Sequence, residues 1–306
     1  MSVRIRTYYA HQIHLYRNFN VNPMEVKTYY PKHPILKEHI AYYYFLEEDS
    51  SFSSSYYAFP QTLQSFNIHK GAKGFFSEGL AEVKANGDNT FQTIIQGKFL
   101  TPLRVELTGP INKITIVFKP LGINQFLPHS FQKLAPLHSQ VFTAWNADPF
   151  YKEFLKAFFS TFHLEKRIEL LESYLITKFQ PLPQTALLQK VITYLTDFDN
   201  AMPIPAIADR LALTEKTLNR TFQKHLGITP VSYRKIARFR HALSNRILLQ
   251  EFTSLTSLGY ESNFYDQAYF TNIYKQLTGE SPKRFFKSMQ LHADQNLVFR
   301  HIEEFE

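Results

Sequence analysis

The spacing of hydrophobic residues changes along the chain. Residues 24–120 contain short apolar or alternating runs, which are typical of β-strands: HIAYYYFL, LQSFNIH, TFQTIIQGKF, LRVELTG and KITIVFKP. Turn-like segments rich in Gly, Asn, Asp and Ser, such as EEDSSFSSS and HKGAKG, separate these runs. From Pro149 to Phe179 apolar residues recur every three or four positions, which predicts one or two amphipathic helices. Pro-Leu-Pro at 181–183 breaks this pattern and marks a domain boundary.

Beyond residue 183 the patterns are helical, and one short phrase occurs twice. GITPVSY at 227–233 and GESPKRF at 279–285 share a Gly, then Thr or Ser, then Pro, then an aromatic residue. We interpret each copy as a joint between helices. The Gly ends one helix, the Thr or Ser caps the next, and the Pro occupies its first position. Tyr233 and Phe285 then fall on the buried side of the next helix.

Upstream of each joint the sequence predicts a short helix, a tight turn and a longer helix, which is the helix-turn-helix pattern. Ala208 and Gly259 occupy the same place in the two short helices, where a small residue lets the longer helix cross closely. Thr214 and Asp266 stand at N-cap positions. Ala212 lies in the first turn, and we expect slight strain there because alanine rarely adopts the left-handed conformation.

The segment between the two units predicts one continuous helix over residues 231–250. Twenty residues span about 30 Å, which is close to one turn of B-DNA at about 34 Å. Such a spacer can place two reading helices in successive major grooves of double-stranded DNA. The candidates for base contacts are polar residues on the outer faces of the reading helices: Lys216, Asn219, Arg220, Gln223, Gln267, Thr271 and Asn272. The candidates for phosphate contacts are cations beside them: Arg234, Lys235, Arg238, Lys275, Lys283 and Arg284.

The distribution of charge supports a polyanionic partner. The formal net charge is +8, and residues 184–290 hold 14 Lys/Arg against 8 Asp/Glu. The chain has no Cys, which excludes disulfides, thiolate metal sites and Cys nucleophiles. His11 and His14 lack further ligands nearby, and nucleotide-binding and nucleophile-elbow motifs are absent from the sequence. We therefore expect no metal, no cofactor and no enzymatic activity. The chain also lacks a long apolar run or a secretory signal, so we expect a cytoplasmic protein without membrane contact.

Over residues 185–290 the chain resembles the DNA-binding domain of AraC/XylS-type transcriptional regulators. The stretch FYDQAYFTNIYKQLTGESPKRF carries most of this resemblance, and RFRHAL in the spacer adds to it. Asn272 departs from the family pattern, in which Arg is common, so we expect the second unit to contribute less affinity. Weaker similarity in YYPKHPILKEHIAYYYF, FPQTLQSFNIH and ITIVFKPLGINQFL implies a β-rich, cupin-like sensor domain.

These observations predict an α+β protein. We expect residues 1–180 to form a β-rich, cupin-like sensor or dimerisation domain with trailing helices. We expect residues 184–290 to form an all-α domain of two helix-turn-helix units, and residues 291–306 to be a surface tail. The predicted function is that of a DNA-binding transcriptional regulator. Its further expected partners are an unknown small-molecule effector, a second copy of the chain in a homodimer and, for an activator, RNA polymerase. The alternative is a small-molecule-binding or enzymatic β-domain with a helical docking module.

Two sets of residues allow two interpretations each. The helical region 150–180 suits either a dimer face or packing within its own domain. An aromatic group in the β-rich part suits either a ligand pocket or core packing: Tyr42, Tyr43, Tyr44, Tyr56, Tyr57 and Phe59.

Overall fold

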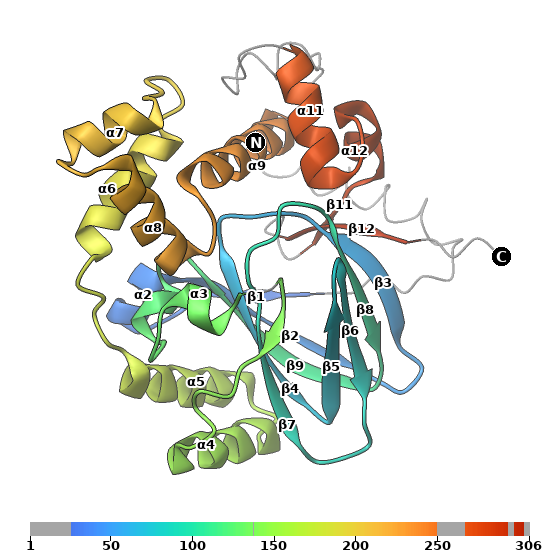
Figure 1. Ribbon diagram of the computed structural model, residues 1–306. Helices are drawn as coiled ribbons and strands as arrows, with labels where there is room; N and C mark the ends of the chain where they lie inside the picture. Colours follow the sequence, from blue (N-terminus) through green and yellow to red (C-terminus); the bar gives the residue numbers. More distant parts are fainter. Residues whose placement is uncertain (1–25, 137, 250–266, 293–296, 303–306) are drawn as a thin grey trace, which may run out of the picture.

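The computed structural model describes residues 26–136, 138–249, 267–292 and 297–302. Its architecture is α+β, which confirms the predicted fold class (Figure 1). Two six-stranded sheets face each other in the β-rich part, and helices cover one sheet and form the C-terminal part. His11, His14 and the first helix of the second helix-turn-helix unit, with Gly259 and Asp266, lie outside the described residues.

The first sheet has the order β1-β2-β9-β4-β7-β10, and all its neighbouring pairs are antiparallel. Its strands are β1 (Thr28–Tyr29), β2 (Ile40–Glu48), β9 (Ile111–Phe118), β4 (Gln64–Lys70), β7 (Phe91–Ile95) and β10 (Gln140–Val141). The longer strands coincide with the apolar runs of the sequence. Their register aligns His69 with Lys113, and Asn67 with Thr115, on neighbouring strands.

The second sheet has the order β11-β12-β3-β8-β6-β5. Its strands are β11 (Gln290–His292), β12 (Leu297–His301), β3 (Ser53–Ala58), β8 (Leu103–Thr108), β6 (Leu80–Ala85) and β5 (Ala72–Ser77). Strands β3 and β5 overlap the turn-like segments at 47–55 and 69–74. Pairing with β8 and β6 overrides the Ser-rich and Gly-containing composition there.

Helices α4 (Pro149–Ser160) and α5 (Leu164–Lys178) show that the amphipathic region forms two helices. Their apolar sides pack on the outer face of the first sheet, in a core that includes Phe154, Phe158 and Leu171. Residues 150–180 therefore use their buried faces for packing within the chain. Short helical segments complete this part: α2 (Pro34–His39), η1 (Ile123–Gln125) and α3 (Phe131–Leu134).

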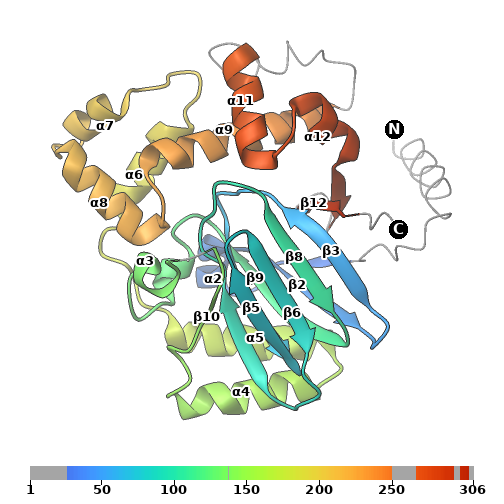
Figure 2. The same ribbon diagram turned by 45° about the vertical axis from the view of Figure 1, so that its right-hand side comes forward.

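The C-terminal helices share one hydrophobic core, which also includes Phe59 and Leu121 of the β-rich part. They are α6 (Thr185–Thr196), α7 (Ile204–Arg210), α8 (Glu215–Leu226), α9 (Pro230–Leu249), α11 (Gln267–Thr278) and α12 (Pro282–Ser288). Helix α9 has 20 residues, as the sequence predicts, and it starts at Pro230. In Figures 1 and 2, α8 and α11 lie at opposite ends of α9.

The repeated phrase is the predicted helix joint. Gly227 and Gly279 both have φ of 76°, the left-handed conformation that ends a helix. Thr229 Oγ1 accepts a hydrogen bond from Ser232 N at 3.1 Å, whereas Ser281 makes no such bond. Tyr233 and Phe285 are 1% and 0% exposed, so the aromatic position anchors each new helix in the core.

The first helix-turn-helix turn also follows expectation. Ala212 has φ of 53°, so a non-glycine residue holds the left-handed conformation in this turn. Thr214 is the N-cap of α8, and its hydroxyl accepts from Thr217 N at 3.2 Å. Ala208 is 1% exposed, in agreement with the close helix crossing.

The C-terminal end differs from the expected surface tail. Strand β12 pairs with β3, so residues 297–301 extend the second sheet of the β-rich part. Arg300 also forms an ion pair with Glu280 at 2.6 Å, and its guanidinium lies 4.8 Å from the centre of the Tyr57 ring. Strand β3 has open backbone N–H and C=O groups on its outer side, and β12 pairs with them. The composition of the sequence does not reveal this pairing.

Candidate nucleic-acid interface

Helix α8 presents the predicted polar face to solvent. Lys216 and Arg220 are exposed, while Leu218 and Phe222 on the opposite side are 1% and 0% exposed. Asn219 and Gln223, between these sides, are half-buried. The side chain of Asn219 donates to the backbone oxygen of Glu215 at 3.0 Å, and its amide has a second N–H and an acceptor oxygen for contact with a base.

Helix α11 has the same organisation. Gln267, Asn272 and Lys275 are exposed and Thr271 is half-buried. The opposite side is anchored in the core by Phe270, Ile273 and Tyr274, which are at most 3% exposed. Both reading helices therefore keep their polar faces free of the β-rich part in the described structure.

The predicted phosphate contacts fall into two groups. Lys283 and Arg284 are exposed in the first turn of α12. In contrast, the cations of α9 lie closer to the protein interior. Arg234 donates to the backbone oxygen of Met202 at 2.6 Å, and Arg238 lies 5.7 Å from the Phe198 ring centre.

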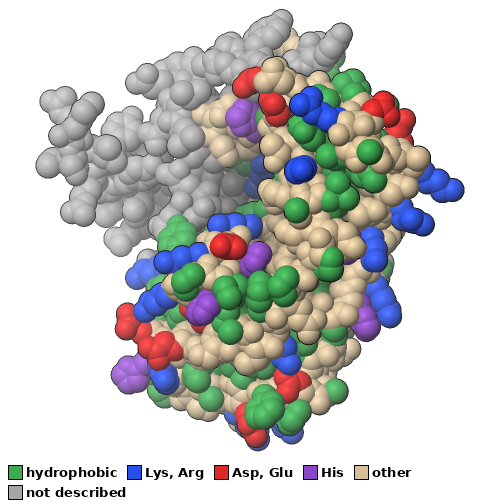
Figure 3. Space-filling view, turned by 90° about the vertical axis from the view of Figure 1, so that its left-hand side faces the viewer, with side chains coloured by type: hydrophobic (Ala, Val, Ile, Leu, Met, Phe, Trp, Pro, Cys, Tyr) green, Lys and Arg blue, Asp and Glu red, His purple; other side chains and the backbone are tan. Residues whose placement is uncertain are grey.

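Lys235, the remaining phosphate candidate on α9, is half-buried. On the molecular face that Figure 3 shows, Lys and Arg side chains lie along one edge and in a second group below the grey residues. The cations of the reading helices and of α12 are more exposed than those of α9, so they are better placed for contact with a polyanion.

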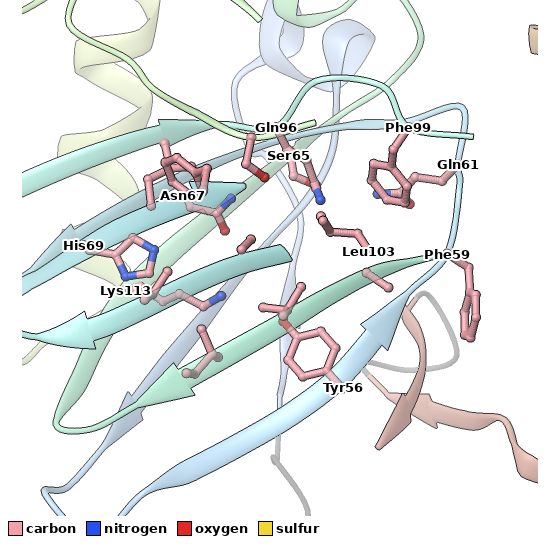
Figure 4. A pocket seen from close by; sticks show the side chains of 18 of the residues that line it. Tyr56, Phe59, Gln61, Ser65, Asn67, His69, Gln96, Phe99, Leu103 and Lys113 are labelled. Atoms are coloured by element: carbon pink, nitrogen blue, oxygen red, sulfur yellow. The ribbon is translucent and has the colours of Figure 1, made fainter. Parts of the chain in front are cut away.

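A second feature is a cavity of about 90 Å³ between the two sheets. Ser65, Asn67 and His69 alternate along β4 and line the cavity, and Lys113 joins them from β9 (Figure 4). The sequence shows this polar alternation, but on a two-faced sheet such a pattern usually marks a solvent face. Here the second sheet covers it, so His69 is 2% and Lys113 5% exposed.

Burial shapes the electrostatics of this cavity. It lowers the pKa of Lys113 to about 8, and burial with the neighbouring Lys113 charge holds the pKa of His69 well below its usual value. Of the aromatic group singled out from the sequence, Tyr44, Tyr56 and Phe59 line the cavity. All six residues of the group also pack in the hydrophobic cores, which supports the core-packing interpretation, and the ligand-pocket interpretation stays a prediction.

Residues 59–63 connect the cavity to the helical part. Arg240 of α9 lines the cavity and donates to the backbone oxygens of Phe59 and Pro60 at 2.7 and 2.8 Å. Lys98 donates to the next three carbonyls, those of residues 61–63, at 2.6–2.9 Å. Five consecutive carbonyls are thus held by two cations, one from each part of the chain. Sequence reasoning missed both roles because the partners are backbone carbonyls on segments distant in the sequence, about 35 residues from Lys98 and about 180 from Arg240.

The two parts meet at further points. Asn124 donates to the backbone oxygen of His225 at 2.9 Å, at the end of α8. Phe59 and Phe285 form an edge-to-face pair with ring centres 4.9 Å apart. Within the described residues, no cluster of three His, Asp or Glu suits a metal ion, and no helix has the length and apolar character needed to cross a membrane.

Comparison with known proteins agrees with the helical geometry. Residues 207–288 match a family model described as a helix-turn-helix domain. The HTH-type transcriptional activator RhaS of Escherichia fergusonii is 33% identical over 99 residues, 32% of this chain and 35% of the relative. The arabinose operon regulatory protein of Escherichia coli is 26% identical over 176 residues, 55% of this chain and 54% of the relative.

The chain spans between about one third and one half of the length of these curated relatives. Among solved structures, ToxT of Vibrio cholerae aligns with a TM-score of 0.44 and 12% identity, over 86% of this chain and 98% of that one. The family match over residues 207–288 confirms the predicted helix-turn-helix character of that region.

Proposed function

We propose that the protein is a sequence-specific DNA-binding transcriptional regulator, since its C-terminal part is an AraC-type helix-turn-helix domain. The observation that carries this proposal is the pair of exposed polar helix faces, on α8 and α11, at the two ends of a 20-residue spacer. The opposite side of each helix is apolar and buried, so each helix can enter a groove while its packing against the core is kept. The matched region, residues 207–288, supports the same conclusion.

Base recognition is assigned to the reading faces. Arg220 suits bidentate contact with guanine, and Asn219 suits bidentate contact with adenine. Gln267, Thr271 and Asn272 contribute from α11. Lys283 and Arg284 support the complex through phosphate contacts, because both are exposed beside the second reading helix.

The β-rich part acts in this proposal as a sensor that modulates DNA binding. The cavity between its two sheets, which has polar and apolar walls, offers a place for a small-molecule effector. Its contacts with α8, α9 and α12 offer a physical route from that cavity to the reading helices. The relatives RhaS of Escherichia fergusonii and Yersinia pestis are named transcriptional activators, which favours activation here, with RNA polymerase as a partner.

Binding to DNA is tested by selecting fragments of the source genome with the purified full chain and titrating the selected fragment by fluorescence anisotropy. The logarithm of the affinity should fall steeply and linearly with the logarithm of salt concentration. Failure to enrich any fragment over random sequence would contradict the proposed function.

Two variants separate the two kinds of contact. Arg220→Ala should lose about 1–3 kcal/mol of discrimination at one base position. Arg284→Ala should weaken binding to all sequences alike and reduce the salt slope by about one. An unchanged base preference in Arg220→Ala would remove that residue from the base-contacting set.

A further inference from the structure

We propose that the cavity between the two sheets binds a small organic anion, a carboxylate with a short apolar portion, and that Lys113 is its main binding residue. This inference rests on the sensor role proposed above and names the chemical class of the effector. Its evidence is the charge, the hydrogen-bond donors and the size of the cavity.

The charged residues that line the cavity are all positive. Its lining includes two cations, Lys113 and Arg240, and no Asp or Glu. The charge of Arg240 is already held by the carbonyls of Phe59 and Pro60. Lys113, in contrast, is 5% exposed and contacts the ring of Tyr44, whose centre lies 5.5 Å from its Nζ. A buried ammonium normally has an anionic partner, and the described residues around the cavity supply none.

The neighbours of Lys113 add hydrogen-bond donors. Thr115 Oγ1 donates to Asn67 Oδ1 at 2.7 Å, which leaves the amide Nδ2 of Asn67 as the group to face a ligand. His69 Nδ1 is buried without a partner among the described residues. Figure 4 shows the side chains of Asn67, His69 and Lys113 converging on the same space from two strands. The Lys113 ammonium and the Asn67 amide are donors that suit a carboxylate, and His69 Nδ1 adds a third donor in the tautomer that carries its proton there.

The size and the far wall of the cavity limit the rest of the ligand. A volume of about 90 Å³ holds roughly six to nine groups of the size of water. The second sheet provides an apolar wall opposite the polar residues: Ala81, Val83, Leu103, Val105 and Leu107. A short aliphatic or single-ring carboxylate fits these limits, whereas a long hydrocarbon chain exceeds them.

The experiment uses the purified full chain and four probes, acetate, propionate, isobutyrate and benzoate, each at 10 mM and each paired with its neutral amide. Thermal unfolding measures binding, because a ligand of the folded state raises the Tm. We expect at least one carboxylate to raise the Tm while its amide does not. Calorimetric titration then gives the affinity of that carboxylate.

Two substitutions locate the site. Lys113→Met should weaken the carboxylate about tenfold or more, the usual consequence of losing a charge-assisted hydrogen bond. Lys73→Met is the matched control, because Lys73 is exposed on β5 and does not line the cavity. Lys113→Gln keeps a donor without the charge and should lose the preference for carboxylate over amide. Lys113→Gln therefore provides a second test of the Lys113 charge if Lys113→Met does not fold.

Three results would overturn the proposal: no Tm increase with any of the four carboxylates, equal increases with the amides, or full binding retained without the Lys113 charge. DNA binding is measured in parallel on the same preparations. Loss of DNA binding alone contradicts the regulator function, whereas loss of the carboxylate response alone contradicts only the ligand class.

Discussion

Replacement of Lys113 by Met should stabilise the free protein, although it removes a charged residue from the inside of the sandwich. Burial lowers the pKa of Lys113 from 10.5 to about 8, so folding disfavours its charged form. This difference corresponds to about 3 kcal/mol at pH 7, as an upper limit. Met has a similar length and a flexible apolar side chain, so it can fill the same space without that cost.

The dependence on pH gives the sharper test. Below pH 8 the Lys113 amine is protonated in both states, and its cost is constant and complete. Between pH 8 and 10.5 the unfolded state binds more protons than the native state, so the wild type gains stability as pH rises. The advantage of Lys113→Met should therefore be greatest at pH 7 and should disappear near pH 10.5.

Urea unfolding of the full chain at pH 7, 9 and 10.5, followed by circular dichroism, measures this advantage, with Lys73→Met as the control that should change little. His69 is aligned with Lys113 on the neighbouring strand, and its lowered pKa keeps it neutral throughout this range. A Lys113→Met protein that is less stable than wild type at pH 7, or an advantage independent of pH, would refute the reasoning.

Three further variants test the helical part and its attachment. Thr214→Ala removes the N-cap of α8 and should cost about 1 kcal/mol in the free energy of unfolding, whereas Thr214→Ser should restore most of it. Gly227→Ala should destabilise by about 1–2 kcal/mol, because φ is 76° and the new Cβ would lie 3.0 Å from a ring carbon of Phe131; equal stability would contradict the left-handed helix end. Arg300→Gln breaks the ion pair with Glu280 and should speed hydrogen exchange in β12, and unchanged exchange would show that the pair does not hold the strand.

The helical part could be predicted from the sequence in detail because local rules determine it. The repeated phrase places Gly227 and Gly279 at helix ends and Tyr233 and Phe285 in the core, and each of these positions follows from backbone preference or from helical spacing. Even the unusual backbone at Ala212 could be expected from its position in the turn.

The cavity could not be predicted, because its residues form a pattern that has two meanings. Alternation of Ser65, Asn67 and His69 with apolar residues predicts a strand with one polar face. Whether that face meets water or a second sheet depends on long-range pairing, which single-sequence patterns do not contain. The role of Arg240 was hidden for the same reason, since its carbonyl partners lie about 180 residues away in the sequence.

The pairing of β12 with β3 has a practical consequence for dividing the protein into pieces. A fragment that stops near residue 180 retains β3 but loses the strand that covers part of its outer side, so the backbone groups of residues 55–58 are left open on that side. Open strand edges recruit other chains. Self-association of such a fragment would then result from the loss of the C-terminal strand. It should not be taken as evidence that the full chain forms a dimer.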